Sequence, residues 1–196
     1  MKSNEHLQAA KQKGTALVEA TLALLVILFL AGLCIELAQM HQTRYLSSLA
    51  LQEAARVAAV THANPLRWRP ILAQGLRPTY ASAVAEQRHT GMTQREGLHP
   101  YYPEVLSPEG ARQAQDKPFV IKPRHHGQPT DAVLHLRLTY VYVPKQPWLR
   151  STIKAIAHLR TAQKSRHSDL HVQMRSAGMV PIVVEHKILM QSDLPD

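Results

Sequence analysis

Residues 15–34 form a run of twenty residues that carries one charge and would present apolar side chains on every face of a helix. About 20 such residues span the roughly 30 Å hydrocarbon core of a bilayer as a helix. The run is too long for a buried core helix of a small domain. We therefore predict that the chain crosses a membrane once, at residues 15–37, and folds its remaining domains outside the bilayer.

Two kinds of cleaved signal are alternatives to a retained span. A secretory signal peptide has an apolar core of about 7–15 residues closed by a small-x-small cleavage site. Here the apolar run is longer and continues without a polar break into residues 36–44. The stretch 31–34 loosely resembles a lipoprotein site, at which Cys34 would be acylated. The smooth continuation of the helix past Cys34 favours the retained span.

The flanking charges predict the orientation of the span. Lys2, Lys11 and Lys13 precede the apolar run 15–34, whereas Glu36 follows that run closely and Arg44 comes later. Short basic flanks stay on the cytoplasmic side of a membrane. We expect the N-terminus in the cytoplasm and the C-terminal region on the far side.

Glu19 is the one charged residue of the apolar run 15–34. A carboxylate inside an apolar helix costs a few kcal/mol in lipid. The side chain either reaches back to the cytoplasmic headgroups or is neutralised by a partner at the same membrane depth. In the second case Glu19 is a determinant of assembly.

A short basic leader ending in Gly14, an apolar helix starting at Thr15 and a glutamate five residues after the glycine occur together. This arrangement resembles the class III signal of type IV pilins. The resemblance implies that a prepilin peptidase cuts between Gly14 and Thr15 on the cytoplasmic face. It also implies that Glu19 pairs with the N-terminal amine of a neighbouring subunit.

The stretches 13–19, 32–36 and 52–59 resemble the TadE-like pilus assembly proteins, although Ala20 stands where members usually carry an aromatic residue. The resemblance implies a pseudopilin, a minor subunit of a tight-adherence or type IV-like pilus. Its partners would be the peptidase, other pilin-like subunits and the inner-membrane assembly platform. Its location would be the bacterial inner membrane, with the C-terminal region in the periplasm, or the pilus itself. Small residues would allow close helix packing in the membrane: Ala16, Ala20, Ala23 and Gly32.

Proline placement divides the chain, because all thirteen prolines lie at or after Pro65. We expect one helix from Thr15 that ends before Pro65, since the residue preceding a proline disfavours helical geometry. Within it, Glu53 and Arg56 have the spacing of a local ion pair. The predicted divisions are leader 1–14, transmembrane helix 15–37, stalk helix 38–64, irregular Pro-rich connector 65–130 and head 131–196.

The predicted head is a small antiparallel sheet with one helix. Alternating apolar residues indicate half-buried strands at 133–143 and 180–190, and a short edge strand is plausible at 119–122. Residues 147–160 between the two long strands have an amphipathic helical pattern. Turn-like, exposed stretches are expected at 67–70 and 99–103. The fold class is therefore α+β, a long transmembrane-plus-stalk helix followed by a small C-terminal sheet.

The sequence offers no pattern typical of catalysis, a cofactor or a metal site, so we expect a protein that is not an enzyme. Its single cysteine excludes an internal disulfide, and its twelve histidines are scattered. From Pro65 onward 18 Lys and Arg against 10 Asp and Glu give a charge of +8. This favours acidic partners, but the arginines are too dispersed to favour specific nucleic-acid binding. The alternative function is an unprocessed bitopic anchor whose basic head binds an envelope ligand or nucleic acid.

Overall fold

The computed structural model describes residues 2–61, 63–107, 133–160 and 169–190, with side chains from Val18 onward except those of 158–160 and Asp169. The chain divides into two compact units, residues 1–39 and 40–196. Helix α1 (Lys2–Val60) contributes to both units. The predicted edge strand at 119–122 lies outside the described residues.

The first unit is a single helical segment of α1 that is long and apolar enough to cross a membrane. From Val18 onward its best 18-residue window has a mean hydropathy of 2.6, and none of that window is buried. Large apolar side chains along it are exposed, among them Leu25 and Leu28, each with about 60% of its surface accessible. An isolated soluble helix would not leave so many large apolar side chains in water.

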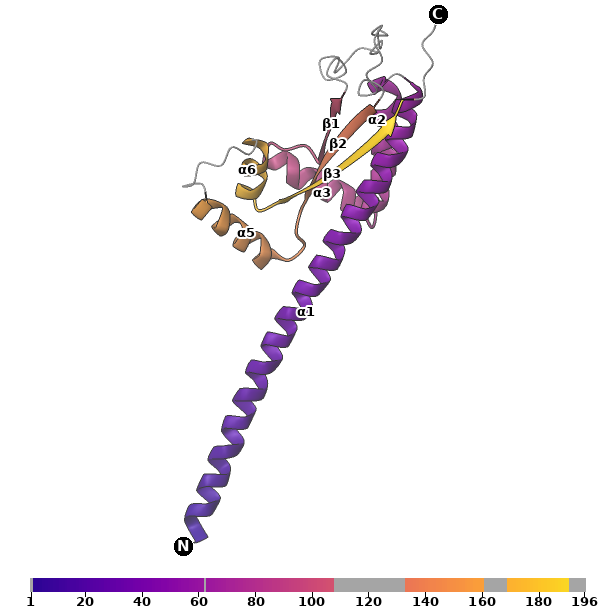
Figure 1. The fold of residues 1–196 in the computed structure, drawn as a ribbon. Coiled ribbons are helices and arrows are strands. Elements are labelled where there is room, and N and C mark those ends of the chain that lie inside the picture. The colour runs from indigo at the N-terminus through magenta and orange to yellow at the C-terminus, as the bar shows by residue number, and fades with distance from the viewer. Residues whose placement is uncertain (1, 62, 108–132, 161–168, 191–196) are drawn as a thin grey trace, which may run out of the picture. The chain divides into compact units, whose positions relative to one another are not determined.

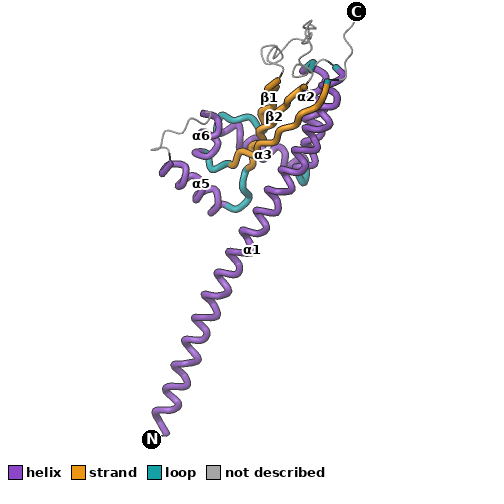
Figure 2. The backbone as a smooth tube through the Cα atoms, in the orientation of Figure 1, coloured by secondary structure: helices purple, strands orange, loops and turns teal. Residues whose placement is uncertain are grey.

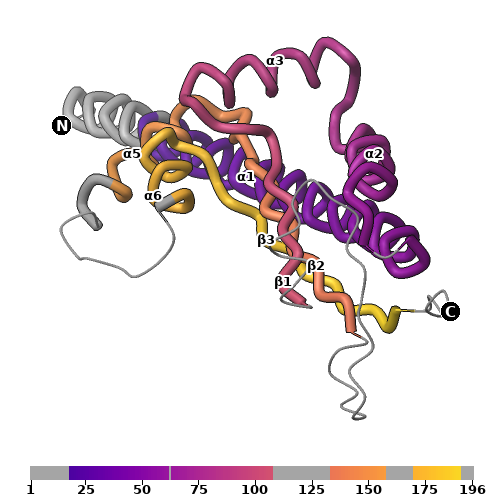
Figure 3. The backbone as a smooth tube through the Cα atoms, turned by 90° about the horizontal axis from the view of Figure 1, so that it is seen from above, coloured from indigo at the N-terminus to yellow at the C-terminus, as the bar shows by residue number. Residues whose placement is uncertain are grey.

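The second unit is built on a three-stranded antiparallel sheet in the order β1–β2–β3 (Figure 3). Strand β1 is Tyr101–Ser107, β2 is Val133–Tyr142 and β3 is Val180–Leu189. The central strand β2 pairs along its whole length with β3, from Val133 opposite Leu189 to Tyr142 opposite Val180. The α+β fold class is confirmed.

One face of the sheet packs on the C-terminal part of α1 and on helix α2 (Pro65–Leu76). The side chains of Leu134, Leu136 and Leu138 are at most 1% exposed, as strand alternation predicts for one face. They pack on small residues along one side of α1, which let the sheet lie close to the helix: Ala50, Ala54, Ala55 and Ala58.

Within the described part of the chain, one end of the other face of the sheet is covered. There Val141 packs with Leu98, which follows helix α3 (Ala83–Arg95). It also packs with Met174 of helix α6 (Asp169–Ser176) and with Ala177 and Met179, which follow that helix. Figure 1 shows the sheet lying between this part of α1 and α6. The remainder of the face carries polar residues. Among the described residues, the ionisable side chains there are half-buried or exposed.

Several sequence predictions for this unit are confirmed. The two long strands and the helix between them occur as β2, β3 and α5 (Pro147–Arg160). Arg56 Nη1 and Glu53 Oε1 are 3.0 Å apart, which confirms the predicted ion pair. The long helix ends at Val60, shortly before Pro65.

The prediction of an irregular connector is wrong for residues 65–107. These residues form α2, a 3₁₀ turn at Arg77–Thr79, α3 and the edge strand β1 (Figure 2). Asn64 starts α2 by accepting a hydrogen bond from the Leu66 N–H at 3.0 Å, and Pro65 suits the first helical turn, where its missing N–H needs no partner. Residues 108–130 of the predicted connector lie outside the described residues.

The two stretches predicted to be exposed turns belong to regular structure. Trp68 lies in α2 and is 2% exposed in the core, with its indole N–H donating to the Ala63 carbonyl at 3.3 Å. The stretch 99–103 leads into β1, where Pro103 is tolerated because β1 is an edge strand. The proline and arginine content of both stretches predicted exposed turns. Packing in the folded chain places them in regular structure instead.

Helices α1 and α2 cross at a glycine. A Cβ placed on Gly75 would lie 2.9 Å from the Ala50 Cβ and 3.1 Å from its Cα. The second of these is a backbone atom, so relief of the clash would require the two helices to separate. In α3, by contrast, a Cβ on Gly91 would meet nothing within 4 Å. The contact with Ala50 therefore requires a glycine at position 75, whereas no such contact requires one at position 91.

We predict opposite effects of alanine at these two glycines. Gly75→Ala should lower the free energy of unfolding by about 1–3 kcal/mol, because overpacking outweighs the gain in helix propensity. Gly91→Ala should raise it by up to about 1 kcal/mol. Urea titration of the full chain in detergent micelles measures both. Stabilisation by Gly75→Ala would contradict the α1–α2 crossing.

Candidate functional site

The residues that the sequence assigns to pilin-type processing and assembly all lie in the first unit, on α1. Gly14, Thr15 and Ala16 are part of the helix, and their side chains are outside the described set. Glu19, Ala20 and Ala23 are exposed. A Cβ placed on Gly32 would meet no atom within 4 Å. A second helix therefore has free access to these small residues and to the Glu19 carboxylate.

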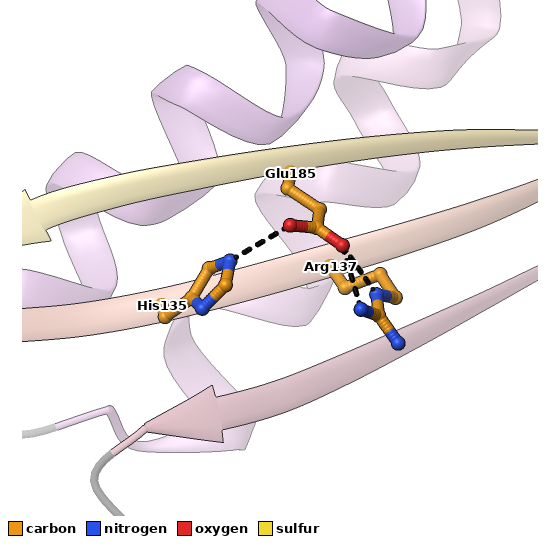
Figure 4. Close-up of polar contacts among 3 residues, drawn as sticks. All are labelled: His135, Arg137 and Glu185. Atoms are coloured by element: carbon orange, nitrogen blue, oxygen red, sulfur yellow. Dashed lines mark hydrogen bonds and ion pairs between the residues drawn. The ribbon is translucent and has the colours of Figure 1, made fainter.

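Three polar residues on the sheet's second face form what we call the outer-face triad: His135, Arg137 and Glu185 (Figure 4). Strand register places Arg137 of β2 opposite Glu185 of β3. The Arg137 Nε and Nη2 atoms each lie 2.7 Å from Glu185 Oε1, and His135 Nε2 lies 3.1 Å from Glu185 Oε2. Both carboxylate oxygens are thus engaged.

The triad joins strands β2 and β3 through charged hydrogen bonds. The hydrogen bond from Arg137 is the main reason that the pKa of Glu185 is held below its usual value. Its side chain is still 40% exposed, so the pair contributes at most about 1 kcal/mol to stability. These contacts favour the ionised form of Glu185, and Arg137 compensates its charge.

Glu185 also borders an open groove between α1 and the edge strand β3. This α1–β3 groove has a volume of about 630 Å³ and is lined by His41, Arg44, Tyr45, Ser48, Val183, Val184 and Glu185. The four α1 residues are spaced i, i+3, i+4 and i+7, so they share one side of the helix. The groove combines one guanidinium, one imidazole and two hydroxyl groups with an apolar valine wall. Such a set suits a ligand with an anionic head.

A half-buried histidine joins α3 to the sheet. His89 Nε2 lies 2.8 Å from the Val141 carbonyl oxygen, and its ring stacks on Tyr140 with centroids 5.5 Å apart. Because a carbonyl only accepts, Nε2 carries the proton. The other ring nitrogen, Nδ1, is buried and has no hydrogen-bond partner among the residues that the structure describes. Burial lowers the pKa of His89, since protonated Nδ1 would need an acceptor there.

Sequence reasoning missed the triad, the groove and the His89 contact. Strand alternation did place His135 and Arg137 on one face of their strand. The partner of Arg137 depends on the register of β3, which a single sequence does not specify. The i, i+3, i+4, i+7 spacing from His41 to Ser48 is the one signal that could have indicated the groove.

The described residues contain no group of three His, Cys, Asp or Glu side chains that could hold a metal ion. His125, His126 and His167 lie outside them. Cys34 is an exposed free thiol. We therefore find no arrangement in the described part of the chain from which to build a catalytic mechanism.

No protein-family model, curated protein or solved structure matches this chain.

We predict that His89 makes the head less stable in acid. An unfolded histidine has a pKa near 6.5, and the folded value is lower, so the contribution is fully present above about pH 6.5. It is lost as the pH falls through the unfolded value towards the folded one. His89→Gln, which can still donate to Val141, should flatten this part of the profile.

Thermal unfolding of the full chain in detergent micelles between pH 8 and pH 5 measures the effect. Exposed His99 supplies the matched control, because His99→Gln should keep the wild-type slope. Identical slopes for wild type and His89→Gln would contradict this role of His89.

Proposed function

We propose that the chain is a pilin-like, TadE-type minor subunit that helps to assemble or anchor a tight-adherence or type IV-like pilus. In this proposal a prepilin peptidase removes residues 1–14, and the span holds the subunit in the inner membrane with its head in the periplasm. The observation that carries the proposal is the exposed Glu19 carboxylate in an apolar helical segment whose most apolar 18-residue window has no buried residue.

An uncompensated carboxylate in lipid requires a partner or a route to water. The new N-terminal amine of a neighbouring, processed subunit would supply a positive charge near the same membrane depth. Around Glu19, Ala20 and Ala23 keep the helix narrow, and Gly32 leaves open space further along. Small residues at such positions allow two helices to approach closely in a membrane. The proposal thus links one charge and one narrow surface to a single event, helix-to-helix docking.

The head supports the proposal in a different way. The C-terminal part of α1 is the central packing element of the α+β head, through Ala54, Ala55 and Ala58. A subunit that docks through the N-terminal part of the same helix would move with its head as one covalent unit. The structural role therefore needs no catalytic group.

A second candidate is an unprocessed membrane anchor whose head binds an anionic envelope ligand. The observation that favours it is the open α1–β3 groove with its exposed Arg44. In this case residues 1–14 would remain on the mature protein. Glu19 would then have no amine of a processed neighbour to meet.

We predict that Glu19→Ala strongly reduces pilus assembly and surface adhesion in the protein's own host. Loss of a contact that offsets a few kcal/mol should reduce assembly by about tenfold or more. The amount of membrane-inserted protein should not fall, because alanine enters lipid more readily than glutamate. Counting fibres and adherent cells, with immunoblots of membranes, measures both effects.

Glu53→Ala is the matched control for this experiment. Glu53 lies on the same helix, is exposed and pairs only with neighbouring Arg56 among the ion pairs of the described residues. It should leave assembly at the wild-type level. Wild-type assembly and adhesion in Glu19→Ala would refute the pilin-like role.

A further inference from the structure

The α1–β3 groove lies at the edge of the sheet rather than over either of its faces. Its lining includes three consecutive residues of β3, which are Val183, Val184 and Glu185. Consecutive residues of a strand point to opposite faces of the sheet, so a space that meets all three lies beside the strand. Within the described ranges β3 pairs with β2 alone. The groove therefore gives access to the outward-facing backbone N–H and C=O groups of β3.

The two edges of the sheet differ in how well they suit a further strand. Strand β1 carries Pro103, which has no N–H to donate, and its register is irregular between Val105 and Ser107. Prolines and bulges commonly keep a sheet edge from pairing with another chain. Strand β3 pairs with β2 in unbroken register over ten residues, and its one proline, Pro181, precedes the groove. The edge formed by β1 is thus protected, whereas the edge formed by β3 can still pair.

The groove has the length of a short extended segment. From His41 to Ser48, α1 rises by about 10 Å at 1.5 Å per residue. Three residues of an extended chain cover about the same distance, and a strand added to β3 would lie about 4.8 Å from it. Alternate side chains of that strand would point towards α1, as Ile182 and Val184 do in β3, where they pack in one cluster with the alanines of α1.

The helix wall of the groove offers a cation and two hydroxyl groups. Arg44 is exposed, and no ion pair to it is found among the residues that the structure describes. Tyr45 and Ser48 line the same wall, and each can donate its O–H group. A guanidinium binds a carboxylate through two parallel hydrogen bonds. This wall therefore fits an acidic side chain.

The strand wall does not oppose an acidic ligand. Its one carboxylate, Glu185, lies 2.7 Å from Arg137 and 3.1 Å from His135. Arg137 thereby compensates the charge of Glu185. Two residues further along β3, Lys187 is exposed and adds a positive charge to this edge. The charges of the edge favour an acidic partner segment over a basic one.

We propose that the α1–β3 groove is the docking site for an extended, acidic segment of a partner protein, which adds to β3 as a fourth strand of the sheet. The backbone of the segment pairs with β3, and an Asp or Glu side chain of the segment accepts hydrogen bonds from Arg44 and Ser48. In this mode of recognition main-chain pairing supplies affinity, and contacts to alternate side chains supply specificity. The inference goes beyond both candidate functions, and it needs neither cleavage after Gly14 nor a particular position of the head relative to the membrane.

The observations favour a peptide over a nucleic acid. A nucleic-acid strand needs a row of cations that follows its backbone. The lining of this groove holds one arginine. A peptide, by contrast, matches the spacing of the backbone groups of β3 and needs one cation for one acidic side chain.

Peptide display on the full chain in detergent micelles tests the proposal. A library of random segments of about seven residues is selected on wild type, and the best binder is compared by fluorescence anisotropy with its amide counterpart, in which Gln or Asn replaces Glu or Asp. We expect the acidic peptide to bind wild type about fivefold more tightly, the upper size for an exposed ion pair. Arg44→Gln should remove the difference, and Arg44→Glu should select segments with Lys or Arg instead.

Arg56→Gln is the matched control, because Arg56 is an exposed arginine of the same helix that does not line the groove. It should keep the wild-type preference. Hydrogen exchange of wild type with and without the peptide then tests the binding mode. Outward-facing amides of β3 should exchange more slowly when the peptide is bound, whereas amides of β1 should be unchanged.

Four results would overturn the proposal. The first is selection on wild type without acidic residues, and the second is an acidic preference that survives in Arg44→Gln. The third is slowed exchange confined to residues outside β3. The fourth is full protection of every β3 amide in the peptide-free chain. Protection at all protein concentrations would mean that the chain's own residues cover the edge, and protection at high concentration alone would mean that a second copy does.

The experiment also separates this proposal from the pilin-like function. Glu19→Ala should bind the acidic peptide as wild type does, because Glu19 lies outside the groove. Wild-type pilus assembly in Glu19→Ala would therefore refute the pilin-like role and leave the docking site intact. Loss of the acidic preference in Glu19→Ala would count against the docking site, since it would show that Arg44 and β3 do not define it.

Discussion

The close packing of the alanine stripe of α1 against the leucine face of β2 is the contact on which the second unit depends. Ala54, Ala55 and Ala58 are fully buried against a face formed by Leu134, Leu136 and Leu138. Small side chains on the helix allow the large ones on the strand to fill the space between them at normal interior density. Without α1 this face of the sheet would be exposed, and a three-stranded sheet with an uncovered apolar face is only marginally stable.

Because of this contact, α1 has two different environments along its length. Over residues 15–34 its surface is apolar on every side apart from Glu19, which suits lipid, and from Ala50 it is apolar on one stripe, which suits a protein core. The transition between the two patterns contains the polar residues of the α1–β3 groove. Gly75 adds to the arrangement, since its missing side chain lets α2 touch Ala50 on the same helix. The head is thus assembled around the continuation of the segment predicted to span the membrane.

The sequence predicted the type of element correctly wherever its apolar residues follow one clear pattern. The apolar run, the alternation in residues 133–142 and 180–189 and the amphipathic pattern of 147–160 all specified element type. Residues 65–107 were mispredicted because their helices depend on tertiary contacts, as with Trp68, whose burial offsets the poor helical composition around it. The Asn64 cap and the edge position of β1 explain how prolines fit there.

The residues of the candidate sites could also be predicted only in part. Glu19 could be singled out because a charge in an apolar run is conspicuous in any fold. The outer-face triad and the groove could not, because each depends on the register of β3 and on the side of α1 that it meets. A sequence gives the face of each strand, but pairing between residues 48 and 50 positions apart is a property of the assembled sheet.

The mature N-terminus is the most direct test of the pilin-like account. Intact mass and N-terminal peptide mapping should be carried out on the protein purified from membranes of its own host. The account predicts that the chain begins at Thr15, because the leader ending in Gly14 is removed before the subunit docks. A mature protein that begins at Met1 would contradict processing and leave a plain membrane anchor.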